Sequence, residues 1–485
     1  MSAPRHLPAS TVAALVTGWA EAGGPAYRAL AERIRLLIAD GRVPPGARLP
    51  SERELTEALG VSRTTVASAY RELRDRGYLS SRRGSGSVTS LPSGAARGTG
   101  GRSTSGMTRT PEFDSAGLLD LTCAASPSAV GIGSAVGAAT EDLASHLGTP
   151  GYHPQGLPEL REEIAAYYEA KGLPTTPDQI VVTAGALAGT ALALRSVAEI
   201  GDRVLTESPT HPNSMDAIRR GGNRIVAAPM TPHGWDLPLL EATIRQTAPR
   251  VAWMVVDFQN PSGRLMPDVE RERLALAFAR NRTTAIIDET LTDLCLGTAP
   301  MPAPFATYNP RGVITVGSLS KSFWGGLRIG WLRVPPALVA RVLDARASMD
   351  LGAPVLEQLI ATRLLAARDE ILPERRTGLL LRRDTLMNAV REHLPSWSFE
   401  VPGGGLSLWC ELPEPVGSSL VGVAERNGVL LMAGSRFSPD GGLERFIRLP
   451  YTIEPDALIE AVRRIAAAYA QLATALPRRN AAMIA

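Results

Sequence analysis

The sequence predicts a small winged helix-turn-helix head, a linker, and a larger α/β body that ends in a small α+β subdomain. Two short helical patterns around a tight turn precede a glycine-punctuated basic run within residues 1–90. Residues 91–117 contain almost no large apolar side chains, and from Leu118 short apolar runs alternate with helical patterns. We therefore expect a head of residues 1–90, a linker of 91–117 and a body of 118–485, with the small subdomain from about 373.

The composition is that of a globular protein whose charge is unevenly spread. Of the 485 residues, 44% are hydrophobic and 20% are charged, which is enough apolar surface for a large core. The formal net charge is +3, but residues 1–90 hold thirteen arginines and eight acidic residues, whereas the body is mildly acidic. We expect the head, and not the body, to meet a polyanion.

Cysteine usage and hydropathy indicate the compartment. Cys123, Cys295 and Cys410 lie far apart and show no metal-ligand spacing, so they are expected to be reduced thiols in the cytoplasm. No apolar run reaches the ~18 residues of a membrane span. The faintly apolar segment 11–20 is too short for one and has no convincing cleavage site.

The head carries the signals of a helix-turn-helix followed by a wing. Apolar residues at helical spacing predict a helix over 25–39. Ser51 and Glu54 form a capping box for a second helix, and Ser62 caps a third. The polar, basic and glycine-punctuated run 78–90 predicts a two-stranded wing.

The third predicted helix begins with SRTT, small polar side chains and an arginine that suit entry into the major groove. The alternative is a small helical docking domain with a solvated charged face. The motifs PSER, SRTTV and RGSG make the head resemble the winged-helix domain of GntR-type transcription regulators. The resemblance implies contacts to a double-stranded DNA operator from Arg53, Ser62, Arg63, Thr64, Thr65 and Gly84, with Arg83 as a further candidate.

The linker, residues 91–117, is rich in Gly, Ser, Thr and Ala. Such a segment cannot bury enough apolar surface to fold. We expect it to be a flexible tether that lets the head move relative to the body.

Several predicted strands of the body end in polar residues. Strands are expected at residues 180–183, 203–206, 251–256, 284–287 and 313–316. Asn260 follows the third of these closely, Asp288 abuts the fourth, and the run from Ser318 to Lys321 follows the fifth. Because open α/β sheets bind ligands beyond the carboxyl ends of their strands, these side chains are expected to converge on one crevice.

The last segment predicts the small α+β subdomain. It contains a helix, strands at 406–412, 429–432 and 446–449, and a final amphipathic helix. We expect this subdomain to close over a ligand and to bring Arg448 to it.

Lys321 is conspicuous because the only other lysine among the 51 basic residues is Lys171. Wherever this chain needed a generic positive charge, it has arginine. A lysine amine, unlike a guanidinium, can lose its proton and form a Schiff base with an aldehyde such as that of pyridoxal phosphate. The alternative is a surface lysine on a turn.

Residues 118 to about 475 resemble the fold-type I, aspartate-aminotransferase-like domain in the segments GYHPQG, ESPTH, QNPSG, SLSK and FIRLP. Head and body together resemble the MocR subfamily of GntR regulators, and within it the members grouped with YczR. The resemblance implies the α/β fold of pyridoxal phosphate-dependent transferases (fold type I), pyridoxal 5'-phosphate as cofactor, and a homodimer.

The resemblance also implies a role for each matching residue. Lys321 would form the Schiff base, Asp288 would pair with the pyridinium nitrogen, and Asn260 would bond the phenolic oxygen of the cofactor. Arg448 would grip the α-carboxylate of an amino compound. Further cofactor contacts would come from Ser318 and Arg328 at the phosphate, the backbone amides of Gly185, Ala186 and Leu187 at a helix N-terminus, Tyr152 from the partner subunit, and His211 stacked on the ring.

Each of these residues has a structural alternative. Asp288 could cap a helix, Asn260 could serve a turn, Arg328 could form a surface ion pair and Arg448 could be an edge-strand charge. For His211, a structural role and a cofactor stack stay open. Taken jointly, in order and at the family's spacing, the residues favour cofactor binding.

Two positions depart from the family pattern. Thr290 stands where the family's regulators usually carry a tyrosine that bonds the cofactor's phenolic oxygen, and Leu187 stands where glutamine is common. Both departures weaken the case for efficient transamination more than the case for binding.

Together these features favour a transcription regulator that binds DNA through its head and senses pyridoxal phosphate or an amino compound through Lys321. The alternative is an active aminotransferase with an appended winged-helix head. A third hypothesis is a body that serves only to dimerise, which the retention of Lys321 in a nearly lysine-free chain disfavours.

Overall fold

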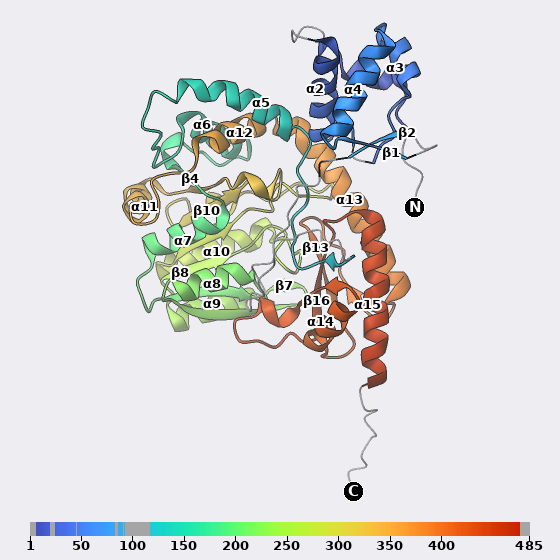
Figure 1. Ribbon diagram of the computed structural model, residues 1–485. Coiled ribbons are helices and arrows are strands. Elements are labelled where there is room, and N and C mark those ends of the chain that lie inside the picture. The colour runs from blue at the N-terminus through green and yellow to red at the C-terminus, as the bar shows by residue number, and fades with distance from the viewer. Residues whose placement is uncertain are drawn as a thin grey trace. The chain divides into compact units, whose positions relative to one another are not determined.

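The computed structural model describes residues 6–19, 25–44, 46–82, 86–90, 92 and 117–475, and the chain divides into two compact units (Figure 1). The head unit comprises Met1–Glu112 and Ala129–Glu141, and the body unit comprises Phe113–Ser128 and Asp142–Ala485. Residues 129–141, which were expected in the body, thus pack with the head unit. The predicted linker lies almost entirely outside the described residues, and its boundaries stay a prediction.

The head unit contains a helix-turn-helix and a two-stranded antiparallel wing. Its elements are α1 (Ala9–Leu15), α2 (Ala26–Ala39), α3 (Glu52–Leu59), α4 (Arg63–Asp75), β1 (Leu79–Arg82), β2 (Gly86–Thr89) and most of α5 (Ile132–Asp142). The capping box of Ser51 and Glu54 begins α3, and Gly60 ends it in the left-handed conformation. Buried Leu30 and Val66 belong to its common core. The predicted helix-turn-helix and wing are confirmed.

An eight-stranded sheet forms the centre of the body unit, in the order β4-β11-β10-β9-β8-β5-β6-β7. The strands are β4 (Ile180–Thr183), β5 (Arg203–Ser208), β6 (Arg224–Thr231), β7 (Gly234–Trp235), β8 (Val251–Met254), β9 (Thr284–Asp288), β10 (Val313–Ser318) and β11 (Gly330–Arg333). Strands β10, β9, β8, β5 and β6 run parallel, whereas β11 and β7 are antiparallel to their neighbours. The predicted mostly parallel sheet is confirmed.

Helices pack around this sheet: α6 (Pro158–Ala170), α7 (Ala186–Val197), α8 (Pro212–Arg220), α9 (Leu237–Thr247), α10 (Asp268–Asn281), α11 (Val339–Arg346) and α12 (Val355–Ala366). The strands contribute continuous apolar runs because both faces are covered. Fully buried Trp253, Ile286 and Ile314 from three adjacent strands meet Leu192 from α7 in the core.

The small subdomain is an α+β layer at the C-terminal end of the body. It contains α13 (Arg368–His393), α14 (Gly417–Arg426), α15 (Pro455–Ala475) and a sheet of β12 (Ser398–Phe399), β13 (Ser407–Glu411), β16 (Phe446–Pro450) and β15 (Met432–Ala433). A separate parallel pair joins β14 (Val429–Leu430) to β3 (Leu119–Asp120). The predicted strands at 406–412 and 446–449 are found, whereas the predicted strand 429–432 is divided into β14 and β15, which belong to different sheets. Pro373 lies inside α13, so the helix begins before the predicted boundary.

The structure bears on two features of the sequence, the absence of a membrane span and the state of the cysteines. Within the ranges described, no helix is both long and apolar enough to cross a membrane. Cys123, Cys295 and Cys410 are free thiols.

Candidate cofactor site and nucleic-acid interface

The predicted site residues of the body stand where parallel strands end. Asp288 is the last residue of β9, Ser318 is the last residue of β10, and Lys321 follows three positions later. Asn260 follows β8, and His211 follows β5. Because these strands are parallel neighbours, their carboxyl ends share one edge of the sheet, as the sequence predicted.

Lys321 lies in a strongly desolvated place. Its Nζ donates to the carbonyl oxygen of Ala124 at 2.9 Å. Burial lowers the pKa of Lys321; the Cys123 thiol and the Asp288 carboxylate act in the opposite direction, and the charges of Arg448 and Arg328 lower the pKa further. The environment therefore favours a neutral amine, the form that can attack an aldehyde.

Asp288 is buried beside this amine, with 8% of its surface exposed. Burial raises the pKa of Asp288, while hydrogen bonds from Thr290 and the charge of Lys321 lower it. One of these bonds runs from the Thr290 amide to Oδ1 at 2.9 Å. Thr290, the position that departs from the family pattern, thus orients the carboxylate through its backbone.

Arg448, on β16 of the small subdomain, reaches the same place. Its Nη1 donates to Asn260 Oδ1 at 3.4 Å, and its Nη2 donates to the Thr122 carbonyl. Its Nε is buried and has no hydrogen-bond partner in the described structure. Burial lowers the pKa of Arg448 to about 10, so the guanidinium still carries its charge at neutral pH.

His211 begins α8 and lies within the electrostatic reach of both cationic side chains. Its Nδ1 bonds the Ser214 hydroxyl at 3.1 Å. Burial, then the charges of Lys321 and Arg448, lower the pKa of His211 to about 3. The imidazole is therefore neutral at physiological pH and can present a flat, uncharged face.

The predicted phosphate contacts surround the N-terminus of α7. Arg328 Nη2 donates to the Ala184 carbonyl at 2.9 Å. A Cβ at Gly185, whose φ is +90°, would lie 2.5 Å from that nitrogen, so only glycine leaves room for the guanidinium there. The Ser318 hydroxyl donates to the Ile329 carbonyl at 3.0 Å. Ala186 and Leu187 form the first turn of α7, and Leu187 is exposed.

Tyr152 is not brought to this cluster. Its side chain is 66% exposed, and the described structure shows no contact between it and the other predicted residues. The position is compatible with the predicted contribution to a partner subunit, which stays a prediction.

Sequence reasoning missed Glu207, which organises two of the loops. Its Oε1 accepts hydrogen bonds from the Val255 amide at 3.0 Å, from Thr210 Oγ1 at 3.1 Å and from Gln259 Nε2 at 3.4 Å. The carboxyl thus joins the loop that carries His211 to the loop that carries Asn260. A fully buried glutamate at the end of a strand leaves no periodic signal in the sequence, so only its place in the ESPTH segment pointed to it.

Sequence reasoning also missed the segment around Thr122 and Ala124. Their backbone carbonyls accept the hydrogen bonds of Arg448 and Lys321. Every residue type carries such a carbonyl, so no sequence signal could have identified them.

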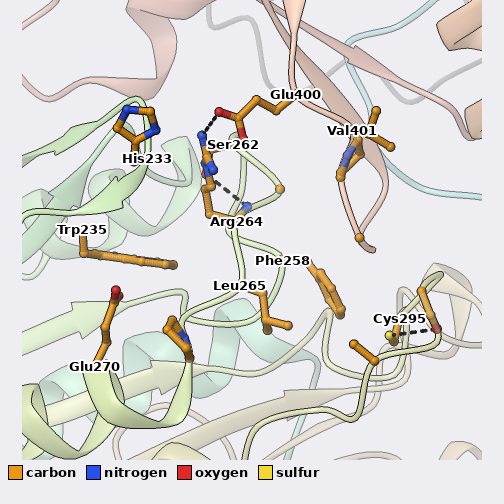
Figure 2. A pocket seen from close by; sticks show the side chains of 16 residues that line it. His233, Trp235, Phe258, Ser262, Arg264, Leu265, Glu270, Cys295, Glu400 and Val401 are labelled. Carbon is orange, nitrogen blue, oxygen red and sulfur yellow. Dashed lines mark hydrogen bonds and ion pairs between the residues drawn. The ribbon is translucent and has the colours of Figure 1, made fainter.

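The body unit also contains a pocket of about 370 Å³ (Figure 2). Its walls include His233 and Trp235, Phe258, residues 262–265, Cys295 and residues 400–403, and Arg264 forms an ion pair with Glu400 across it. None of the residues predicted for the cofactor lines it. The pocket is therefore distinct from the strand-end site.

The predicted DNA-contacting residues gather at the N-terminal end of α4. Ser62 accepts a hydrogen bond from the Thr65 amide at 3.1 Å, and its hydroxyl also bonds those of Thr64 and Thr65 at 2.7 and 2.8 Å. The Arg63 side chain is exposed, and Arg53 on α3 is exposed and paired with Glu57 at 3.2 Å. Gly84 and Arg83 lie outside the described residues.

Comparison with protein families assigns both parts. Residues 134–465 match the family described as aminotransferase class I and II, and residues 26–88 match the bacterial regulatory proteins of the gntR family. The fold and these matches define a class: a helix-turn-helix regulator fused to an aminotransferase-like domain. The chain belongs to the aminotransferase class I and II family, with the GntR-type head that is found in the MocR subfamily and that implies DNA binding.

The chain is similar to two proteins that are named as regulators. The uncharacterized HTH-type transcriptional regulator YdcR of Escherichia coli is 29% identical over 450 residues, covering 87% of this chain and 94% of the relative. The probable rhizopine catabolism regulatory protein MocR of Rhizobium meliloti is 30% identical over 347 residues, covering 66% and 67%. These findings confirm the predicted MocR-type arrangement, whereas the narrower resemblance to YczR stays a prediction.

A solved structure confirms the predicted fold of the body. The α-aminoadipate aminotransferase LysN of Thermus thermophilus, complexed with N-(5'-phosphopyridoxyl)-L-leucine, superposes with a TM-score of 0.68 at 26% identity, covering 74% of this chain and 94% of LysN. The body is therefore a pyridoxal phosphate-type aminotransferase fold.

Proposed function

We propose that this regulator binds pyridoxal 5'-phosphate at Lys321 and that the occupancy of this site changes the DNA binding of the head. The observation that carries the proposal is that Lys321 and Asp288 lie at the ends of the adjacent strands β10 and β9 and that both side chains are desolvated. The chain has only one other lysine. The relatives that span both parts are named as regulators, which favours regulation over turnover.

The residues present fit the cofactor. Lys321 supplies an amine whose lowered pKa eases the loss of its proton before it attacks the aldehyde, and buried Asp288 can hold a proton on the ring nitrogen. Arg328 and the free amides at the N-terminus of α7 offer charge and donors to its phosphate. When bound, pyridoxal phosphate supplies an aldehyde for amines and a ring that withdraws electrons.

The effector is proposed to be pyridoxal phosphate itself or an amino compound that bears a carboxylate. Arg448 is buried, charged and keeps an unpartnered Nε, so a carboxylate would satisfy it. Asn260 holds its Nη1 in place. LysN, which holds a phosphopyridoxyl amino acid, supports this class of ligand.

We further propose a homodimer in the cytoplasm. Exposed Tyr152 would meet the cofactor phosphate of the partner subunit, and two heads would bind repeated half-sites of an operator.

The first test is the visible absorption spectrum of the purified protein with added pyridoxal phosphate. A band near ~420 nm is expected, and Lys321→Ala should abolish it because the bonding amine is gone. Lys171→Ala is the matched control, since Lys171 forms an ion pair with Asp293, with 3.0 Å between Nζ and Oδ1, and Asp293 is not one of the predicted site residues. A parent protein without the band, or a Lys321→Ala variant that keeps it, would contradict the proposal.

A further inference from the structure

A short segment of the body unit precedes α5 in the sequence and is separated from the rest of that unit by residues 129–141. We call the described residues Gly117–Ser128 the strap. The strap belongs to the body unit, whereas the segments on both sides of it, up to Glu112 and from Ala129 to Glu141, belong to the head unit. The chain thus runs from the head unit into the body unit and back again.

The strap is held by Lys321 and Arg448, the same two side chains that the proposed function assigns to ligands. Its Ala124 carbonyl accepts from Lys321 Nζ at 2.9 Å, and its Thr122 carbonyl accepts from Arg448 Nη2. Arg375 holds the Pro127 carbonyl at 2.8 Å. The attachments at Thr122 and Ala124 therefore depend on the state of the site. The start of the strap is held independently of the site, because β3 pairs with β14 and Arg464 donates to the Gly117 carbonyl.

Shortly after the strap, the first turn of α5 is bonded to α2 within the head unit. Asp40, the C-cap of α2, is only 4% exposed and accepts from the Ser134 amide at 3.0 Å and from the Ser134 hydroxyl at 2.7 Å. At Gly133, an added Cβ would lie 3.0 Å from Asp40 Oδ1, so the approach is close. The carboxylate thus caps the first turn of α5 and ties it to α2.

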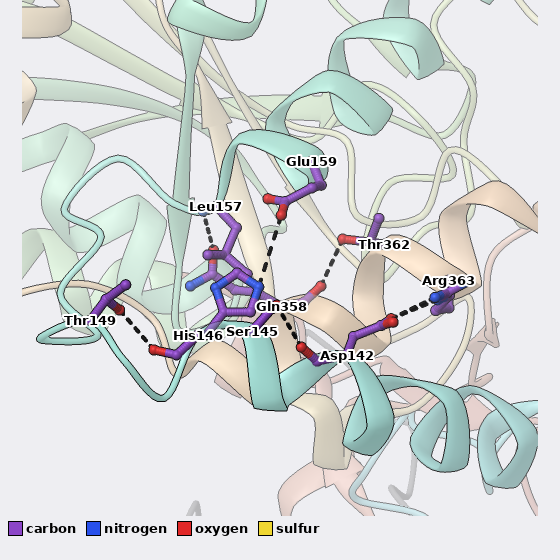
Figure 3. A network of polar contacts seen from close by, with 9 residues as sticks. All are labelled: Asp142, Ser145, His146, Thr149, Leu157, Glu159, Gln358, Thr362 and Arg363. Atoms are coloured by element: carbon purple, nitrogen blue, oxygen red, sulfur yellow. Dashed lines mark hydrogen bonds and ion pairs between the residues drawn. The ribbon is translucent and has the colours of Figure 1, made fainter.

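The other end of α5 is fastened to the body unit (Figure 3). Asp142, its last residue, accepts from Arg363 Nε at 3.1 Å and from Nη2 at 2.5 Å. In the same network the Gln358 side chain of α12 accepts from the Leu157 amide at 2.7 Å.

We propose that the strap transmits the occupancy of the site to the head: a ligand at Lys321 and Arg448 releases the strap at Thr122 and Ala124, and this release loosens the hold of α5 on α2. This inference rests on the proposed function and names its route of regulation. When the Lys321 nitrogen bonds to the aldehyde carbon, the aldehyde oxygen leaves as water with two hydrogens of the amine, so Ala124 loses its donor. A carboxylate on Arg448 competes with the Thr122 carbonyl for the guanidinium.

Amide hydrogen exchange of the full-length protein tests the route with two probes. Pyridoxal phosphate addresses Lys321, and N-(5'-phosphopyridoxyl)-L-leucine addresses Arg448 without bonding to the lysine. Each probe is expected to speed exchange in the strap, the first turn of α5 and the last turn of α2 by about fivefold, the effect of losing one hydrogen bond. Slowed or unchanged exchange there would overturn the inference.

The exchange rates of Lys321→Ala distinguish loss of the bond to Ala124 from a general effect of ligand binding on stability. Without any probe, this variant lacks the donor to Ala124, so its strap and α5 should exchange as fast as those of the loaded parent. Parent-like exchange in the variant would contradict the route.

Asp40→Ala separates the two halves of the route, with exposed Asp75→Ala as the matched control on α4. In Asp40→Ala, pyridoxal phosphate should still give the visible band and still free the strap, but α2 should exchange fast from the start and no longer respond. A band with an unresponsive strap would overturn the inference and leave the proposed function standing. The absence of the band in the parent protein as well would overturn both.

Discussion

At the scale of single residues, one simple signal identified much of the site: a polar residue directly after an apolar strand. Asp288, Ser318 and Asn260 were predicted in this way, and the structure places them at one edge of the sheet. Glu207 stands at the end of β5 in the same manner, yet its role depends on Gln259 and Val255, which are far away in the sequence. Partners of this kind become visible only in the folded chain.

Glu207 should make the stability of the protein depend on pH. Burial raises the pKa of Glu207 from 4.5 to about 7, and none of the bonds from Val255, Gln259 and Thr210 offsets it fully. Between these two pH values the folded state holds a proton that the unfolded state has released, so the free energy of unfolding should fall as pH rises, by about 3 kcal/mol in all.

Glu207→Gln should remove this decrease, because an amide does not titrate. Urea unfolding of the parent and the variant between pH 4.5 and pH 7 measures the difference. Parallel stability curves for the two proteins would contradict the assignment.

At the scale of elements, α10 shows how a helix is fixed against the loops of the site. Its Arg271 is fully buried, pairs with Asp257, and donates to the carbonyls of Met266 at 2.8 Å and Ala303 at 3.0 Å. Asp257 also accepts from Thr292. The Arg271 guanidinium therefore joins the loop before Asn260 to the segment after Asp288. From the sequence alone, an arginine inside a predicted helix would be expected to face solvent.

Arg271→Ala should destabilise the body unit by about 3–5 kcal/mol, because Asp257 would be left buried without its partner. Arg273→Ala is the matched control, since this arginine of the same helix pairs with Glu241 at the surface and should matter by about 0–1 kcal/mol. Urea unfolding at pH 7 measures both changes, and similar losses in the two variants would disprove the buried role.

At the scale of the whole molecule, the chain separates two kinds of chemistry. The head carries the excess of arginine, and α4 presents Ser62, Arg63 and Thr64 at its exposed N-terminal end. The body carries a desolvated amine, a buried carboxylate and a buried guanidinium at one place. Such a division suits a protein that reads DNA with one part and a small molecule with the other.

Arg63→Ala should weaken the binding of duplex DNA and reduce the slope of log affinity against log salt by about one unit, since one phosphate contact releases about one counterion. Arg71→Ala, exposed further along the same helix, is the control. Fluorescence anisotropy at several salt concentrations measures both, and an unchanged slope for Arg63→Ala would exclude this contact.

The sequence by itself determined the helix-turn-helix, the parallel sheet and most residues of the candidate site, because capping residues, hydrophobic periodicity and strand-end polar residues are local patterns. Only the tertiary structure decided that residues 129–141 pack with the head unit, that Thr122 and Ala124 occupy Arg448 and Lys321, and that Asp40 caps α5. Every residue has a backbone carbonyl, and contacts between distant residues leave no local pattern in the sequence. The partners of Lys321, Arg448 and Asp40 could therefore be identified only from the folded structure.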